Sequence, residues 1–163
     1  MLATNGLRTV QTMPRQKRSS RQQRQQKGVW PLSADVEEHL KKVRDQHGDL
    51  LKLRKVINSV EGRGIYAATI TDPDTSDADK QNVLVVGGQH GNEESGRIVA
   101  LGLVDWLVTK SAAATRRKQK IVVMPNINPD SAETDAHANA IGVQPNLDHD
   151  AKKGPTTPEG EAV

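Results

Sequence analysis

The chain of 163 residues has no cysteine and no phenylalanine, and its aromatic residues are Trp30, Tyr66 and Trp106 alone. Without cysteine, neither a disulfide framework nor a metal site with thiolate ligands can form. The scarcity of aromatic rings removes the stacking platforms that bind single-stranded nucleic acid. It also leaves the core to Val, Ile, Leu and Ala. No apolar run approaches the roughly 20 residues of a membrane span, so we expect no membrane partner.

Acidic residues are absent before Asp35, although seven of the 23 Lys and Arg residues lie there. The net charge of +3 therefore belongs to the beginning of the chain, and the remainder is net acidic. Residues 1–28 are rich in Gln, Arg and Ser without apolar periodicity, which predicts a disordered basic tail before one domain over residues 29–163. A nucleic-acid-binding arm or a transit-peptide-like segment are alternatives, but a solvated tail is the simpler interpretation. We expect no nucleic-acid partner and, because no apolar signal-peptide segment is present, a cytoplasmic protein.

The first part of the domain has the pattern of a helix followed by a β-hairpin. Ser33 can cap a helix whose apolar stripe continues to the stop at Gly48. Residues 52–71 alternate around the turn Glu61–Gly64, which is typical of a hairpin at the edge of a sheet.

Two short apolar runs then suggest a β-α-β unit. Val83–Val86 has the composition of a strand buried on both faces, and Ile121–Met124 is the second strand. Residues 93–109 between them have helical spacing, with Trp106 expected in the packed interface. Strands joined through a helix run parallel, so both should end at the same edge of the sheet.

His90 and Glu93 follow the first of these strands at a His-x-x-Glu spacing. Imidazole nitrogen and carboxylate oxygen are zinc ligands, and catalytic zinc sites often take two ligands from a short spacer. Gly91 allows a tight turn between them, and the positive end of a helix favours an anion at position 93. The same residues could simply begin the helix, with Asn92 as N-cap, so the spacing alone leaves both interpretations open.

Further motifs follow in a definite order. The second strand leads into Asn128-Pro129-Asp130, and Asn146 lies farther on. With these landmarks the chain resembles the zinc carboxypeptidase family of metallopeptidases, in which His-x-x-Glu, a helix, a strand, Asn-Pro-Asp and an Asp-Leu-Asn-Arg segment follow one another. Ser59–Arg63 is similar to that family's Ser-x-Glu-Gly-Arg turn. The resemblance covers roughly residues 33 to 163.

The resemblance implies an α/β fold with a mixed, mostly parallel sheet flanked by helices. It also implies a zinc ion held by His90 and Glu93, and hydrolysis of peptide substrates. The family's two substrate-binding arginines fall on His137 and Leu147, while the asparagine of that segment is retained as Asn146. His137 and Asn146 are therefore the candidate substrate-binding residues, with weaker binding of a substrate carboxylate expected.

The family's third zinc ligand and its catalytic glutamate belong to a part that follows Val163. We therefore expect an incomplete domain, either a fragment or a truncated product, whose last residues from Thr157 look like the start of another helix. His149 is a nearby substitute ligand, although an exposed loop histidine is the simpler interpretation. No catalytic residue is assigned.

Two other functions stay open. A zinc deacylase of the aspartoacylase and succinylglutamate desuccinylase type, acting on an acylated amino acid, also begins with His-x-x-Glu after a strand. The Asn-Pro-Asp motif and the Glu-Gly-Arg turn favour the peptidase. A non-catalytic fragment or binding module is the third possibility, favoured for the isolated chain by the missing ligand.

Overall fold

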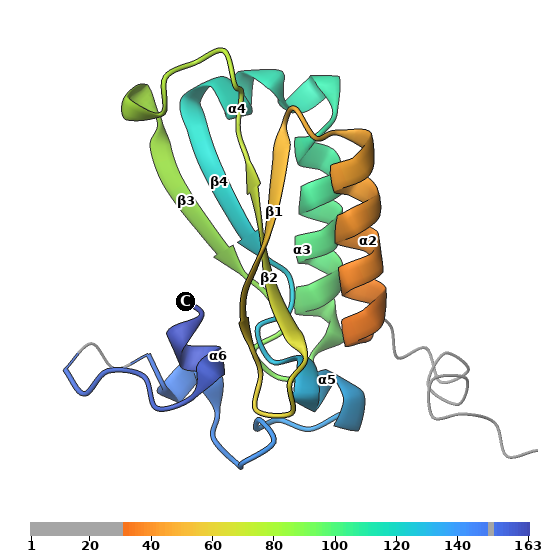
Figure 1. Cartoon of the computed structure of the whole chain (residues 1–163), viewed down its shortest axis with the longest axis vertical. Helices are drawn as coiled ribbons and strands as arrows, with labels where there is room; N and C mark the ends of the chain where they lie inside the picture. The colour runs from red at the N-terminus through yellow and green to blue at the C-terminus, as the bar shows by residue number, and fades with distance from the viewer. Residues whose placement is uncertain (1–30, 150–151) are drawn as a thin grey trace, which may run out of the picture.

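The computed structural model describes residues 31–149 and 152–163, so the predicted tail over residues 1–28 lies outside the described residues. A four-stranded mixed sheet forms its centre, with strand order β1-β2-β4-β3 (Figure 1). The helices and strands, in chain order, are α2 (Ser33–Gln46), β1 (Leu51–Asn58), β2 (Gly64–Ile70), β3 (Gln81–Val86), α3 (Glu94–Leu107), α4 (Ala113–Lys118), β4 (Gln119–Met124), α5 (Pro129–Thr134) and α6 (Pro158–Glu161).

The strand pairings confirm the predicted hairpin and the predicted parallel unit. β1 and β2 are antiparallel, with Leu51 opposite Ile70, and β1 lies at one edge of the sheet. β3 and β4 are parallel and in register from Gln81 opposite Gln119 to Val86 opposite Met124. The predicted mixed sheet flanked by helices is confirmed, but the described sheet is not mostly parallel, because β1–β2 and β2–β4 are antiparallel and β3–β4 alone is parallel there.

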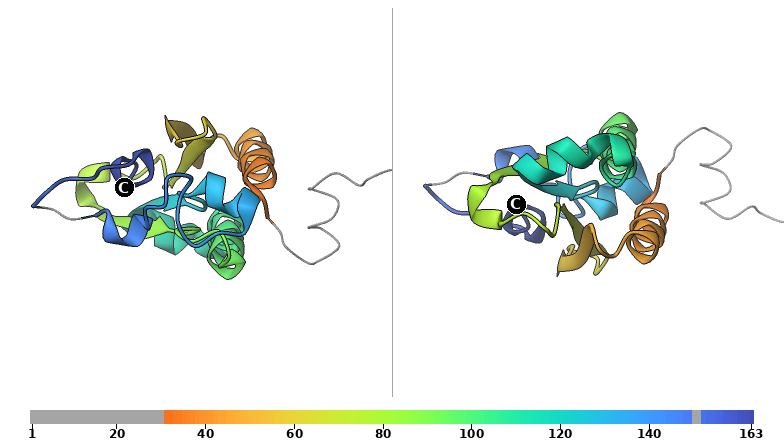
Figure 2. Two further views of the ribbon diagram at one scale, coloured as in Figure 1. Left: turned by 90° about the horizontal axis from the view of Figure 1, so that it is seen from below. Right: turned by 90° about the horizontal axis from the view of Figure 1, so that it is seen from above.

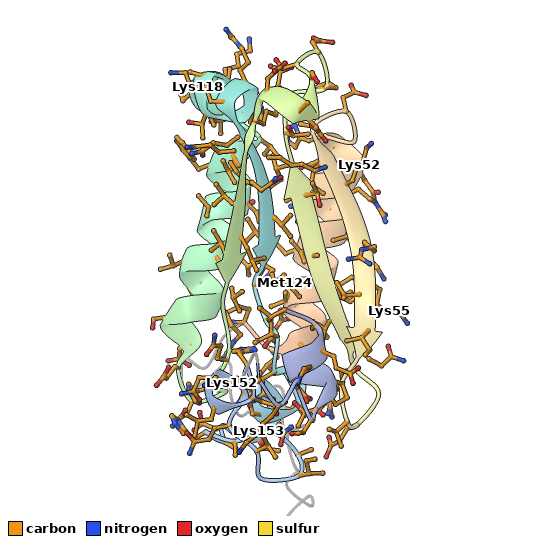
Figure 3. The ribbon with its side chains drawn as sticks, turned by 90° about the vertical axis from the view of Figure 1, so that its left-hand side faces the viewer. Lys52, Lys55, Lys118, Met124, Lys152 and Lys153 are labelled. Carbon is orange, nitrogen blue, oxygen red and sulfur yellow. The ribbon has the colours of Figure 1, made fainter. Side chains whose placement is uncertain are left out.

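Helices α2 and α3 cover one face of the sheet, and α6 lies on the other side; Figure 2 shows the same arrangement along the strands. The larger core is aliphatic, as the composition requires, and includes Leu40, Leu51, Ile70, Val104 and Val123. A smaller cluster on the second face joins Met124 and Ile127 to Ala162 beside α6. In Figure 3, Met124 lies just above α6. The C-terminal segment therefore covers the sheet at the end where β3 and β4 finish.

Two expectations about burial were wrong. Leu84, in a strand predicted to be buried on both faces, is 49% exposed, because Val83 and Val85 face the larger core and Leu84 alternates onto the opposite face. Trp106 is 44% exposed because the buried stripe of α3 passes through its neighbour Leu107. Within the described ranges no single helix is long and apolar enough to cross a membrane. Helix α3 and the helical residues 110–118 reach that length and apolar content only when they are taken together, and the pair is bent by 85°.

The ends of the helices also differ from expectation. Leu32, not Ser33, is the N-cap of α2, and the Asp35 carboxylate accepts from its N–H at 3.0 Å. The Ser33 hydroxyl instead donates to Glu133, which ties α2 to α5. Arg116 is buried and donates to the carbonyl of Thr109 at 2.7 Å, just beyond the C-terminal end of α3.

The single tyrosine of the chain provides a test of how α2 packs on the sheet. Tyr66 of β2 donates its hydroxyl hydrogen bond to Glu37 of α2 at 2.6 Å. Burial, followed by this hydrogen bond, raises the pKa of Tyr66 to about 12. We expect an ultraviolet absorbance titration to show ionisation near that value rather than near the usual ~10.

The pH dependence follows from the sign of this shift. The unfolded chain ionises first, so the stability from Tyr66 is present below about pH 10 and is lost as the pH rises above it. Glu37→Gln should lower the pH midpoint of Tyr66 ionisation. The midpoint should stay above the usual pKa of tyrosine, because burial, the larger cause of the shift, remains. A wild-type midpoint near 10 would show that Tyr66 is not packed as described.

Candidate functional site

The ends of β3 and β4 continue side by side as two hydrogen-bonded loops. Ile127 N–H donates to Gly87 O at 3.2 Å, and Asn128 N–H donates to Gly88 O at 3.1 Å. This confirms that the His-x-x-Glu and Asn-Pro-Asp segments meet at one edge of the sheet.

Asn128 holds the loop that leads to His90. Its side chain is fully buried, and Nδ2 donates to Gln89 O at 2.9 Å. Its Oδ1 accepts from Ser131 N–H at 3.3 Å, which caps α5, and Pro129 follows at the first helical position. One amide thus joins the end of β3 to the start of α5.

Asp130 connects the same edge to the upstream turn. Its carboxylate is buried and accepts from Ser59 Oγ at 2.7 Å and from Glu61 N–H at 2.9 Å. Arg63 Nη1 donates to it at 2.7 Å. The Ser-x-Glu-Gly-Arg turn and the Asn-Pro-Asp motif, which are far apart in the sequence, are therefore in direct contact.

His90 is buried and held by the segment after α5. Its Nδ1 lies 2.8 Å from the carbonyl oxygen of His137. A carbonyl oxygen only accepts, so Nδ1 carries the proton and Nε2 of the neutral ring keeps its lone pair. A ring held in this way through its other nitrogen is the usual state of a metal-binding histidine.

The His137 ring lies directly against His90. The two ring centroids are 3.6 Å apart, with 8° between the planes. His137 Nδ1 lies 3.4 Å from Asn92 Oδ1, and the side chain is exposed. The candidate substrate-binding residue is thus next to the candidate metal ligand.

The turn between the two candidate ligands requires glycine at its centre. A Cβ on Gly91 would collide with the backbone of Ser131 and Ala132 in α5. The N–H groups of Gly91 and Asn92 both donate to Ala136 O, at 2.8 and 3.2 Å. The turn is therefore packed against α5 and pinned to the segment that follows it.

Glu93, rather than Asn92, is the N-cap residue of α3, and its side chain makes no capping hydrogen bond. The expected Asn92 N-cap is therefore wrong by one residue, since the N-cap position falls on Glu93 itself. The Glu93 carboxylate is exposed at the carboxyl end of β3. Both candidate ligands therefore belong to the turn that leaves the carboxyl end of β3.

The remaining candidates are farther along the chain. Asn146 is exposed in the short 3-10 helix Pro145–Leu147, and His149 is exposed in the loop after it. Among residues 31–149 and 152–163, no cluster of three or more His, Asp or Glu could hold a metal ion. The structure thus does not bring His149 to His90 and Glu93 as a third ligand.

Two buried carboxylates that the sequence did not single out order the C-terminal segment. Glu159, at the start of α6, accepts from Asn139 Nδ2 at 3.1 Å. Burial opposes the ionisation of Asp148, but hydrogen bonds from Thr156 and Thr157 lower its pKa to about 2. The helix suggested after Thr157 is present, with Thr157 Oγ1 accepting from Gly160 N–H at 3.2 Å.

The His90–Glu93 turn, in which His90 is buried and Glu93 exposed, thus lies beside Asn-Pro-Asp at the carboxyl ends of two parallel strands in an α/β sheet. The family model for zinc carboxypeptidase matches residues 36–154. The chain therefore belongs to the zinc carboxypeptidase family.

Curated relatives are similar over part of their length. Carboxypeptidase D of Mus musculus is 28% identical over 115 residues, which cover 67% of this chain and 8% of that protein. The carboxypeptidase N catalytic chain of Rattus norvegicus is 31% identical over 109 residues, covering 63% and 24%. The chain thus spans less than a quarter of the length of these two relatives.

Solved structures share the fold. A metallo-carboxypeptidase from Burkholderia cenocepacia superposes with a TM-score of 0.67 at 26% identity, covering 80% of this chain and 36% of that one. Thrombin activatable fibrinolysis inhibitor gives a TM-score of 0.74 at 14% identity, covering 88% and 48%. The described elements therefore correspond to less than half of these two chains.

The contact between the two motifs leads to a stability prediction. Asp130→Asn should lower the free energy of unfolding by about 1.5–3 kcal/mol, because buried hydrogen bonds to a charged acceptor are lost. Glu61→Gln is the control, since its exposed ion pair with Arg63 should contribute less than about 1 kcal/mol. Chemical denaturation followed by circular dichroism measures both. Equal losses would contradict the role assigned to Asp130.

Proposed function

We propose that this chain supplies the His-x-x-Glu part of a zinc carboxypeptidase site acting on peptide substrates, with His90 and Glu93 as metal ligands. The observation that carries the proposal is the state of the turn at the end of β3. His90 is fixed through Nδ1 with Nε2 available, and the Glu93 carboxylate is not used to cap α3. Zinc, when bound there, supplies polarisation of a scissile carbonyl and a bound water of lowered pKa.

The protein residues around the turn orient these ligands. Asn128 holds the incoming loop through Gln89 O, and Ala136 and His137 accept three hydrogen bonds from the turn. A catalytic zinc takes three protein ligands and a general base works beside it. The described residues offer two ligands, so we expect the 163-residue chain to bind zinc weakly and to hydrolyse peptides poorly or not at all.

His137 and Asn146 are the proposed contacts for substrate. In place of two arginines, His137 offers a cation only when it is protonated. Each charge-assisted hydrogen bond contributes roughly 1.5–3 kcal/mol, so binding of a substrate carboxylate should be weaker by on the order of 10²- to 10⁴-fold. Lys152 and Lys153, which could replace the charge, lie on the loop before α6 (Figure 3).

The contact between Asp130 and the Ser59–Arg63 turn favours a peptidase over a zinc deacylase, because it unites the two motifs that the resemblance assigns to the peptidase side. The two-ligand site favours a non-catalytic role for the isolated chain. One experiment separates the three.

Zinc stoichiometry should be measured with turnover of a blocked dipeptide and of an N-acylated amino acid. We expect weak zinc binding and little turnover for the wild type, because two ligands do not complete a catalytic site. His90→Ala should abolish the zinc binding, whereas the control His149→Ala should leave it unchanged.

Each result has a consequence. Tight binding of one zinc ion with dipeptide turnover would mean that a local group completes the site. Hydrolysis of the acylated amino acid alone would favour the deacylase. Unchanged zinc binding in His90→Ala would contradict the proposed site.

A further inference from the structure

Arg97 is a buried cation in the first turns of α3. It occupies a position on the buried stripe of the helix, and its side chain is 0% exposed. Within the described part of the chain it forms no ion pair with Asp or Glu, and its Nη2 has no hydrogen-bond partner. Burying an unpaired charge costs several kcal/mol, so a packing role alone would be met better by an apolar side chain.

The hydrogen bonds of Arg97 all go to backbone carbonyls. Nη1 donates to Gly91 O at 3.0 Å and, at 3.4 Å, to His90 O. Nε donates to Pro31 O at 2.9 Å. The guanidinium therefore joins α3 to the His90–Glu93 turn and to the chain that enters α2.

The turn is held from two directions with opposite polarity. Its donors, the N–H groups of Gly91 and Asn92, go to the carbonyl of Ala136. Its acceptors, the carbonyls of His90 and Gly91, receive the guanidinium of Arg97. The two peptide units from His90 to Asn92 can therefore not rotate without breaking hydrogen bonds on both sides.

We propose that Arg97 is a positioning residue for the His90–Glu93 turn, and that it keeps the two ligands in one orientation through the carbonyls between them. The link to metal rests on the proposed function, since it takes His90 and Glu93 as the ligands. The orientation of the turn does not depend on the proposed function, and it can be measured without metal.

Arg97→Met and Arg97→Lys in the full chain test the proposal, with Arg116→Met as the matched control. Arg116 is also buried, 6% exposed, and also donates to backbone carbonyls, those of Leu107 and Thr109 at the opposite end of α3. For each variant, amide hydrogen exchange at Gly91 and Asn92 is measured by NMR without metal. Zinc affinity is measured by chelator competition, and global stability by denaturation.

In Arg97→Met we expect exchange at Gly91 and Asn92 to accelerate about tenfold or more relative to amides in β4, because the turn loses the donors on one side. Zinc affinity should fall about 10- to 100-fold, as for other partners that orient metal ligands. Arg97→Lys keeps one donor group, so it should recover part of the slow amide exchange and part of the zinc affinity. Arg116→Met should lower global stability with neither local effect.

Unchanged exchange in Arg97→Met, or equal changes in Arg116→Met, would overturn the proposal. If Arg97→Met does not fold, Arg97→Lys decides by the same two amides. Zinc binding that survives His90→Ala would contradict the proposed function, while the exchange data would still decide the role of Arg97.

Discussion

The parallel pairing of β3 and β4 is the constraint on which the site depends. It brings the two loops out at one edge, and Asn128 then joins them, because its backbone N–H donates to Gly88 O and its buried side-chain amide donates to Gln89 O. Leaving either carbonyl buried and unpaired would cost about 1–3 kcal/mol. The course of the chain up to His90 is therefore set by Asn128, and the turn beyond it is limited by the contact of Gly91 with α5.

The Asn-Pro-Asp motif makes physical sense because its three residues have three separate tasks in consecutive positions. Asn128 donates a hydrogen bond to a carbonyl of the loop that follows β3. Pro129 begins α5, where its missing N–H is not needed. Asp130 accepts a hydrogen bond from the upstream Ser59–Arg63 turn. The short helix α5 is thereby held at both flanks, and its backbone forms the wall against which Gly91 packs. A substitution at one of the three therefore disturbs a different neighbour in each case.

Apolar periodicity was sufficient to predict the hairpin, the parallel unit and the meeting of the two motifs, because these depend on which strands pair. It was not sufficient for Leu84 and Trp106, whose exposure depends on what covers each face. Nor could it reveal the stacking of His137 on His90, which depends on how the chain returns after α5. Arg97 did leave a signal, since it is in helical phase with Ala100 and Val104 on the buried stripe. In a sequence, a charged residue at such a position is usually interpreted as the border of the buried face of the helix. Only the backbone carbonyls that accept from Arg97 show why its side chain is buried.

The hydrogen bonds of the His90–Glu93 turn bear on how metal and folding are coupled. In small zinc domains the ligands come together only with the metal, so binding energy becomes folding energy. Here the N–H groups of Gly91 and Asn92 donate to Ala136 O, and His90 Nδ1 donates to His137 O. The turn is thus ordered by the protein itself, and zinc would add stability only in proportion to the logarithm of its concentration relative to its dissociation constant. A weakly held ion would then leave the fold almost unchanged, so a loss of metal at this site would not by itself unfold the chain.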